Sequence, residues 1–265
     1  MVLVAASALL LALAGCGDPG AASSAAGSSP APLSGATGPQ ATGNLTVFAA
    51  ASLTEAFDQI GEDFEAAHPG TVVTMNFGSS SALAQQILSG APADVFASAA
   101  PAPMDDVIDG VDGRGDPAVF ARNRLQIAVP VGNPGDVRGL ADFADPNLTI
   151  ALCAAQVPCG AAALDALQAA GITPAADTLE QDVKAALSKV RLGEVDAALV
   201  YRTDVLAAGD EVEGIAFPES DRTANDYPIT VLDGAPHADS GDVFVDYVLS
   251  EEGQRVLAEA GFETP

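Results

Sequence analysis

The pattern of apolar and polar residues changes its period repeatedly after Asn44. The continuous apolar run Leu45–Ala50 predicts a buried strand, and the residues Ser52–Glu55 fit a capping box at the start of a helix. The apolar positions of that helix recur every three or four residues, at Leu53, Phe57, Ile60 and Phe64. A strand that leads directly into an amphipathic helix is therefore the first unit of the predicted fold.

Units of this kind continue to the end of the chain. Further strands are predicted at residues 71–77, 94–98, 125–130, 149–152, 197–201, 215–217 and 228–232, and further helices at 81–88, 160–170, 183–190, 239–249 and 251–260. Alternating strands and helices indicate an α/β fold in which helices flank mainly parallel sheets. The length suits two such sheets, each in a lobe of roughly 110 residues.

The order of the predicted strands suggests where the chain passes between these lobes. We predict two crossings, near Arg122–Leu125 and near Asn225–Pro228. Lobe I then comprises residues 44–123 and 225–265, and lobe II comprises residues 124–224. Two connecting segments make a two-segment hinge, and we expect the lobes to close about it when a ligand binds.

The N-terminal segment has the composition of a targeting signal. The apolar run Val2–Leu13 is too short to span a bilayer, so residues 1–15 are predicted to be a signal peptide. The run ends in Leu13-Ala14-Gly15-Cys16, which resembles a bacterial lipobox with Cys16 as the lipidated residue. An ordinary Cys in a cleaved signal is the alternative. Residues 16–43, rich in Ala, Gly, Ser and Pro, read as a flexible tether. We therefore expect an exported protein, lipid-anchored on the outer face of the cytoplasmic membrane.

The charge and the composition of the chain narrow the function classes. Ten basic residues stand against 36 acidic ones, and the net charge of −26 argues against a nucleic-acid partner. Hydrophobic residues make up 49% of the chain, which is typical of a packed globular protein.

Cysteine and histidine are scarce. An exported protein lies in an oxidising compartment, so a disulfide between Cys153 and Cys159 is plausible, with a pair of buried free thiols as the alternative. A metal site is not expected, because His68 and His237 have no ligand spacing to this pair.

Small and hydroxyl-bearing residues gather at the junctions where predicted strands meet helices. Ser52 and the run Ser79–Ser81 each follow an apolar strand and precede a helix. Cys159 and Val183 lie in the first turns of two later helices, where backbone N–H groups have no intrahelical acceptor. Tyr201 ends an apolar strand with a phenol that donates one hydrogen bond. Several such junctions that meet at one point would bind an anion.

Taken together, these segments resemble the periplasmic molybdate-binding proteins of ABC transporters, within the type II solute-binding superfamily. The resemblance covers nearly all of residues 45–262. It is carried by AAASL (Ala49–Leu53), FGSSSALAQQI (Phe77–Ile87), GAPADVFASA (Gly90–Ala99), the turn Val157–Gly160, the segment Asp182–Leu187, the strand end Val200-Tyr201 and FPESDRTANDYPITVL (Phe217–Leu232).

The resemblance implies a two-lobed type II periplasmic binding protein that is not an enzyme and has no cofactor. Molybdate, and tungstate with it, would be bound in the interlobe cleft, with no side chain coordinating the metal. Ser52 and Ser80 would donate hydroxyl and backbone hydrogen bonds to the oxyanion. Cys159 and Val183 would offer backbone N–H groups, and Tyr201 its hydroxyl. The bound anion would pass from a monomeric protein to an ABC transporter permease.

The residues themselves agree with such a site, because none of the five positions carries a Lys or Arg. Four helix N-termini of roughly +0.5 charge each would offset the charge of a dianion. A lining of donors without a carboxylate predicts rejection of an anion that carries a proton, such as phosphate. Sulfate or another tetrahedral oxyanion is the alternative ligand.

Two other classes of function fit the sequence less well. A Ser hydrolase using Ser79–Ser81 needs a base, but His68 and His237 lie in predicted surface turns, and the chain has no G-x-S-x-G motif. An adhesion or sensor module without a ligand has no need for five donor positions.

Overall fold

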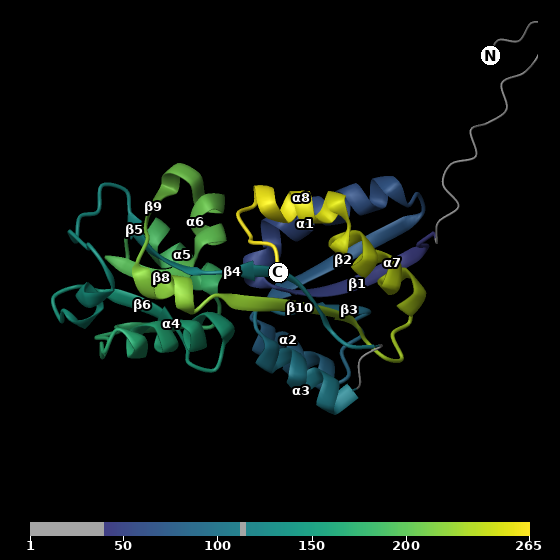
Figure 1. Ribbon diagram of the computed structural model, residues 1–265, viewed down its shortest axis with the longest axis horizontal. Helices are drawn as coiled ribbons and strands as arrows, with labels where there is room; N and C mark the ends of the chain where they lie inside the picture. Colours follow the sequence, from purple (N-terminus) through teal and green to yellow (C-terminus); the bar gives the residue numbers. More distant parts are fainter. Residues whose placement is uncertain (1–39, 112–114) are drawn as a thin grey trace, which may run out of the picture. The chain divides into compact units, whose positions relative to one another are not determined.

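The computed structural model describes residues 40–111 and 115–265 of the chain, and these contain two five-stranded sheets (Figure 1). The first sheet has the strand order β2-β1-β3-β10-β4. Its strands are β1 (Gly43–Ala50), β2 (Thr71–Gly78), β3 (Val95–Ala97), β4 (Ala118–Asn123) and β10 (Asn225–Val231). The second sheet has the order β7-β6-β8-β5-β9. Its strands are β5 (Leu125–Pro130), β6 (Ile150–Cys153), β7 (Thr178–Glu180), β8 (Ala197–Tyr201) and β9 (Val212–Ile215).

Helices cover both faces of each sheet (Figure 1). On the first sheet, α1 (Thr54–Ala67), α7 (Ala238–Leu249) and α8 (Glu251–Glu259) pack on one face, and α2 (Ser80–Leu88) and α3 (Pro101–Val111) pack on the other. On the second sheet, α4 (Pro158–Ala169) lies opposite α5 (Val183–Arg191) and α6 (Arg202–Ala208). Short 3₁₀ turns complete the elements: η1 (Ala51–Leu53), η2 (Leu140–Ala144), η3 (Gly209–Glu211) and η4 (Pro218–Arg222). We call the first sheet with its helices the first half, and the second sheet with its helices the second half.

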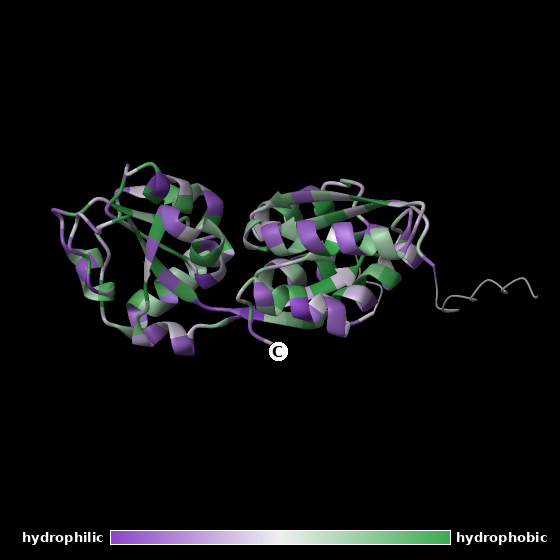
Figure 2. Cartoon of the chain, turned by 90° about the horizontal axis from the view of Figure 1, so that it is seen from above, coloured by the Kyte–Doolittle hydropathy of each residue, from purple (hydrophilic) through white to green (hydrophobic). Residues whose placement is uncertain are grey.

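The two halves have different cores. In the first half, rings from different elements contact one another, as Phe64 does with Phe244 at a centroid distance of 5.1 Å. The second core is almost entirely aliphatic and rich in alanine, and Ala166, Ala186 and Ala198 in it are fully buried. Figure 2 shows helices with hydrophobic and hydrophilic residues in alternation, which is the amphipathic pattern that the sequence predicted.

Four of the five strands in each sheet run in the same direction. In the first sheet only β10 is reversed, because it pairs antiparallel with both β3 and β4. In the second sheet only β5 is reversed, between β8 and β9. The predicted fold class, with helices flanking mainly parallel sheets, is therefore confirmed. Each sheet is mixed, because the strand that enters it from the other sheet comes in reversed.

The chain passes between the sheets at two places. Arg124 alone separates β4 from β5, and residues 216–224 connect β9 to β10. Arg124 forms an ion pair at 2.5 Å with Glu263 and another with Asp221, so the first connection is tied to the C-terminal segment and to the second connection. The sheets hold the strands that the predicted lobes assign to them. The lobe boundaries themselves stay a prediction.

The structure corrects two sequence-based expectations in the first half. Ser52 does not cap α1, because it lies inside η1 and Leu53 precedes the helix. The tether does not extend to Gly43, because Ala41 is buried and the backbone of Thr42 forms hydrogen bonds with the hydroxyl of Ser240. The pattern also missed α3 and β4 in the first half, and β7 and α6 in the second half.

The predicted signal peptide (1–15), the lipidation site Cys16 and most of the tether (16–43) lie outside the described residues. Within the described ranges, no helix combines the length and the apolar character needed to cross a bilayer.

Candidate functional site

A small cavity lies between the two halves, and all five predicted ligand-binding residues line it. Its volume is about 20 Å³. For comparison, one water molecule needs roughly 10–15 Å³ of such space. The first half contributes Ala50, Ala51, Ser52, Gly78, Ser79, Ser80 and Ala99, and the second half contributes Pro158, Cys159, Asp182, Val183 and Tyr201. The cavity therefore suits a compact ligand of a few atoms.

Ser52 reaches the cavity from the turn that follows β1. The side chain is 4% exposed, and its Oγ lies 2.9 Å from the hydroxyl of Tyr227 on β10. This tertiary contact explains why Ser52 does not cap the helix: its hydroxyl is held toward the sheet instead of toward the first turn of α1. The orientation of the Ser52 hydroxyl is therefore set by Tyr227, whichever of the two is the donor, and not by the helix.

The three consecutive serines at the start of α2 have three different partners. Ser79 is the N-cap, and its Oγ accepts a hydrogen bond from the N–H of Ala82. The Oγ of Ser80, which is 1% exposed, accepts a hydrogen bond of 2.9 Å from the N–H of Ala99. Ser81 donates to the carbonyl of Gln156 in the second half at 2.7 Å. In these bonds Ser79 and Ser80 only accept through Oγ, so the hydroxyl protons of both have no protein acceptor among them, and of the two Ser80 is the more deeply buried.

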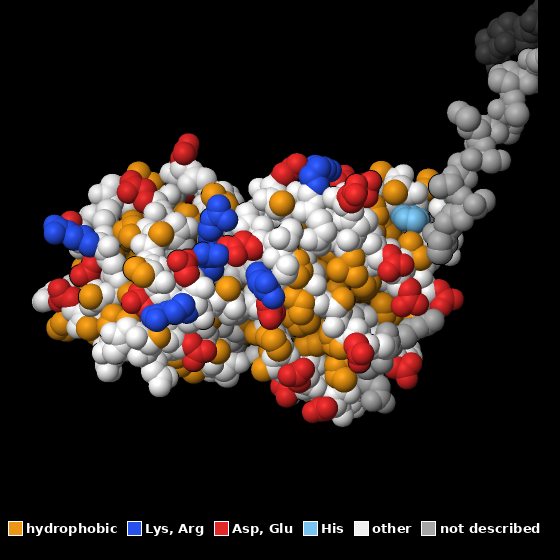
Figure 3. All heavy atoms as spheres, viewed as in Figure 1, with side chains coloured by type: hydrophobic (Ala, Val, Ile, Leu, Met, Phe, Trp, Pro, Cys, Tyr) orange, Lys and Arg blue, Asp and Glu red, His pale blue; other side chains and the backbone are white. Residues whose placement is uncertain are grey.

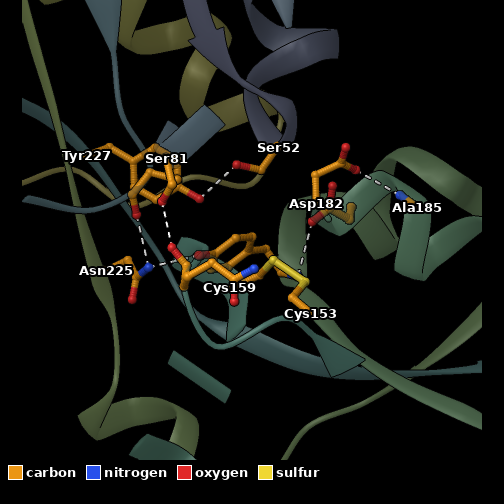
Figure 4. The surroundings of a disulfide bond; sticks show 12 residues. Ser52, Ser81, Cys153, Cys159, Asp182, Ala185, Asn225 and Tyr227 are labelled. Carbon is orange, nitrogen blue, oxygen red and sulfur yellow. Dashed lines mark hydrogen bonds between the residues drawn. A yellow bond between two sulfur atoms is a disulfide. The ribbon is translucent and has the colours of Figure 1, made fainter. Parts of the chain in front are cut away.

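The second half presents the N-termini of two helices to the cavity. Pro158 occupies the first position of α4 and Cys159 the second, and Val183 occupies the first position of α5. Backbone N–H groups at these positions have no intrahelical acceptor, and the helix dipole makes both ends partly positive. Asp182 caps α5 by accepting a hydrogen bond of 2.9 Å from Ala185 (Figure 4).

A disulfide holds the turn that carries Cys159. It joins Cys153, at the end of β6, to Cys159 in the first turn of α4 (Figure 4). Of the two alternatives for Cys153 and Cys159, a disulfide or a pair of free thiols, the structure contains the disulfide. Gly160 belongs to the same tight turn, because a Cβ there would lie 1.9 Å from the carbonyl oxygen of Ala154. Only glycine allows this close approach of the helix to the preceding loop.

Tyr201 ends β8, and its hydroxyl accepts a hydrogen bond of 2.8 Å from the side-chain amide of Asn225. The side chain is 1% exposed, and this burial raises the pKa of the phenol well above its usual value. Tyr201 therefore stays protonated and keeps a hydroxyl proton to donate.

The charges around the cavity differ from the expectation in one respect. None of the lining residues is a Lys or Arg, as predicted, but the carboxylate residue Asp182 is among them. The expectation of a lining without a carboxylate is therefore wrong. The reason is local: α5 uses this side chain as its N-cap, so the helix that supplies the N–H of Val183 also brings an acidic group to the edge of the site.

Lys184, which directly follows the lining residue Val183, forms ion pairs with other residues. Its Nζ pairs with Glu55 of the first half at 2.7 Å and with the buried Asp204 at 3.2 Å. Burial lowers the pKa of Lys184, but the two carboxylates outweigh it and raise that pKa above its ordinary value. Burial also raises the pKa of Asp204, to about 6, although Lys184 opposes this.

Sequence reasoning missed the residues behind the lining. Asn225 and Tyr227 lie in the segment Phe217–Leu232, which was recognised only as a return connection, and Asn123 ends β4. The side-chain amide of Asn123 lies 3.4 Å from the Tyr227 hydroxyl. The available signal was that Asn225 and Tyr227, which both carry polar groups, lie in a largely buried strand, because buried polar groups need hydrogen-bond partners.

Neither histidine that the enzyme hypothesis would need as a base lines the cavity. The Nδ1 of His68 accepts a hydrogen bond from the N–H of Ala41, and the ring packs against Phe64. His237 lies beside Asp94, with 3.5 Å between Nδ1 and the carboxylate. Within the described ranges, no group of three or more His, Cys, Asp or Glu residues is arranged to hold a metal ion.

Comparisons with known proteins support a transport role. Residues 45–263 match the family model described as bacterial extracellular solute-binding protein. The chain is 41% identical, over 98% of its own length and 96% of the relative, to the molybdate-binding protein ModA of Mycobacterium tuberculosis H37Rv. These matches confirm the resemblance that the sequence motifs predicted.

Solved structures agree with this result. The substrate-binding domain of a putative molybdenum ABC transporter from Clostridium difficile has a TM-score of 0.63 and 28% identity, covering 84% of this chain and 99% of that one. The periplasmic molybdate-binding protein of Azotobacter vinelandii has a TM-score of 0.71 over 83% of this chain and 99% of that chain, and at 21% identity it shows the shared fold. The chain belongs to the family of bacterial extracellular solute-binding proteins.

Proposed function

We propose that this protein captures molybdate, and tungstate with it, in the cavity between its two halves and delivers the anion to an ABC transporter. The observation that carries the proposal is the lining itself. Four buried hydroxyls, of Ser52, Ser79, Ser80 and Tyr201, and the N-termini of α2, α4 and α5 converge on one small space without a basic side chain. The names of the relatives point to the same ligand.

In the proposed complex, Ser52, Ser80 and Tyr201 donate hydroxyl hydrogen bonds, and Cys159 and Val183 donate backbone N–H groups. Hydrogen bonds to a charged acceptor are worth about 1.5–3 kcal/mol each. Several of them, with the dipoles of the helices, replace the water that a dianion loses on entering the cavity. Neutral donors do this without a counter-charge that would hold the anion too firmly for release.

The proposal extends to the location of the protein. Cleavage after residue 15 and lipidation of Cys16 would anchor the chain outside the cytoplasmic membrane, and the tether after Cys16 would let it reach a permease. The surface carries many acidic side chains and few basic ones (Figure 3), in keeping with the net charge of −26. Such a surface favours a monomer, because copies of the chain repel one another. Lobe I (44–123 and 225–265) and lobe II (124–224) would close about the two connections.

The test is a parallel calorimetric titration with molybdate, tungstate, sulfate and phosphate. We expect molybdate and tungstate to bind at least about 100-fold more tightly than sulfate, which corresponds to about 2.7 kcal/mol. Sulfate that binds as tightly as molybdate would favour the alternative of a general tetrahedral-oxyanion carrier.

Phosphate tests the contribution of Asp182. If the wild type binds phosphate and Asp182→Asn does not, the Asp182 carboxylate accepts the phosphate proton, and the site does not exclude anions that carry a proton.

A further inference from the structure

Asn225 joins the two halves directly behind the cavity. It is the first residue of β10, where the chain returns to the first sheet. Its side-chain nitrogen lies 2.9 Å from the carbonyl oxygen of Ala99 in the first half. The same nitrogen lies 2.8 Å from the hydroxyl of Tyr201 in the second half. Ala99 and Tyr201 both line the cavity, so Asn225 contacts it only through them.

The orientation of this amide is fixed by its backbone partner. A carbonyl oxygen only accepts hydrogen bonds, so the atom that faces Ala99 must be the NH₂ group of Asn225. The second N–H of that group then points at Tyr201, which receives it on its oxygen. The proton of the Tyr201 hydroxyl has to go to another acceptor.

Inside the protein, the acceptor available to that proton is the neighbouring hydroxyl of Tyr227, which interacts with Tyr201 and lies 2.9 Å from Ser52 Oγ. Asn123 also directs its amide nitrogen at Tyr227. The orientation of Asn123 is fixed as well, because its Oδ1 accepts the N–H of Arg124.

A count of protons then shows that hydrogen-bond donors remain for the cavity. The three hydroxyls of Ser52, Tyr227 and Tyr201 have three protons, and their two mutual contacts use at most two. The amide nitrogens behind them only donate. At least one hydroxyl proton is therefore left for the cavity, and the proton of Ser80 is left there too, because its oxygen receives the N–H of Ala99.

We propose that Asn225 is a positioning residue that makes Tyr201 a proton donor to the bound anion and holds it against the first half. This inference rests on the proposed function. The ligand and Asn225 do not touch. Asn225 acts by supplying the hydrogen bond that Tyr201 accepts, which leaves the phenol proton for the oxyanion.

The variant Asn225→Asp reverses the direction of this hydrogen bond while it keeps the shape of the side chain. An ionised carboxyl accepts the Tyr201 proton and takes it from the anion, so we expect molybdate affinity near neutral pH to fall by about 100-fold. Asn225→Ala removes the amide without offering an acceptor, and we expect a loss of about 10-fold. A purely structural role predicts the opposite order, because aspartate fills the space of asparagine and alanine does not.

The pH profile provides a readout that loss of packing would not change. The introduced carboxyl lies beside a carbonyl and near an anion, so its pKa is raised, and once protonated it donates again. Molybdate affinity of Asn225→Asp should therefore recover as the pH falls, while the affinity of the wild type changes little over the same range. Asn76→Asp, on an exposed position of β2, adds the same charge and should behave like the wild type.

A double-mutant cycle with Tyr201→Phe separates coupling from simple repulsion. We expect Asn225→Asp to cost much less affinity in the Tyr201→Phe background, since no phenol proton is left to redirect. Two results would overturn the role of Asn225 and leave the proposed function standing. One is that the affinity losses of Asn225→Asp and Tyr201→Phe add up in the double mutant. The other is that Asn225→Asp binds molybdate as well as Asn225→Ala does at every pH. A wild-type protein that binds neither molybdate nor tungstate would overturn the proposed function, and this inference with it.

Discussion

The two halves line the same cavity with different chemical groups. The first half offers side-chain hydroxyls, Ser52 and Ser80, whose oxygens are held by other residues of that half. The second half offers mainly backbone N–H groups, at Cys159 and Val183, which no substitution other than one to proline removes. The first contribution depends on residue identity and the second on the path of the backbone. The same difference determines which mutations in each half reduce the affinity for the anion.

The largest effect is expected from Gly160→Ala, which moves the backbone of the second half. The new Cβ would lie 1.9 Å from the Ala154 carbonyl oxygen, so the first turn of α4 must shift. We expect molybdate affinity to fall by about 100-fold or more, because the N–H of Cys159 moves with that turn. Calorimetry measures the loss.

Gly139→Ala is the matched control in the same half. A Cβ at this position would have no other atom within 4 Å, and the φ of 178° at Gly139 is extended backbone. The variant should bind like the wild type. Equal affinities for Gly160→Ala and the wild type would show that the N-terminus of α4 does not hold the anion.

A smaller effect is expected in the first half from Ser80→Ala. This substitution removes one donor from the cavity and leaves the buried N–H of Ala99 without its acceptor. We expect about a 10- to 100-fold loss of affinity and about 1–3 kcal/mol of lost stability. Titration and chemical unfolding measure the two quantities separately.

The neighbouring Ser81→Ala is the control, since Ser81 is only partly buried and donates to Gln156 instead of facing the ligand. It should cost a few-fold in affinity at most. A larger loss for Ser81→Ala than for Ser80→Ala would mean that the contact between the halves matters more than the hydroxyls of the first half.

The same contrast explains what the sequence was able to predict. Ser52 and Ser80 were found because a strand, a hydroxyl residue and a helix follow one another locally. The exact contact of Ser52 was predicted wrongly, since its partner Tyr227 lies 175 positions away and a tertiary hydrogen bond overrides the capping preference. Cys159 and Val183 have side chains that reveal nothing about their N–H groups, so the family resemblance was needed to select them.

The elements that were missed also have physical reasons. Helix α3 contains Pro101, Pro103 and Gly110, which weaken the helical signal, although prolines are tolerated in a first turn. Strand β4 lies at the edge of its sheet, and its alternation of buried and exposed residues is short. Asn225 was overlooked because its two partners, Ala99 and Tyr201, come from different halves of the molecule.

The smallest effect on the cavity is expected from Asp204, which lies beneath it and accepts the N–H of Tyr201. Asp204→Asn should change affinity by no more than about twofold, but it should change how stability depends on pH. In the folded protein the pKa of Asp204 is raised from 3.8 to about 6, chiefly by burial. A raised carboxyl pKa stabilises the fold below the unfolded value, and this contribution is lost as the pH rises through the folded value.

The free energy of unfolding of the wild type, relative to Asp204→Asn, should therefore fall between about pH 4 and pH 7. Asp105→Asn, at an exposed position of α3, serves as the control and should leave this difference flat. In Lys184→Met the fall should extend to higher pH, because the Lys184 ammonium at 3.2 Å lowers the folded pKa of Asp204. A difference that rises with pH instead would mean that the pairing with Lys184 outweighs burial and lowers the pKa of Asp204.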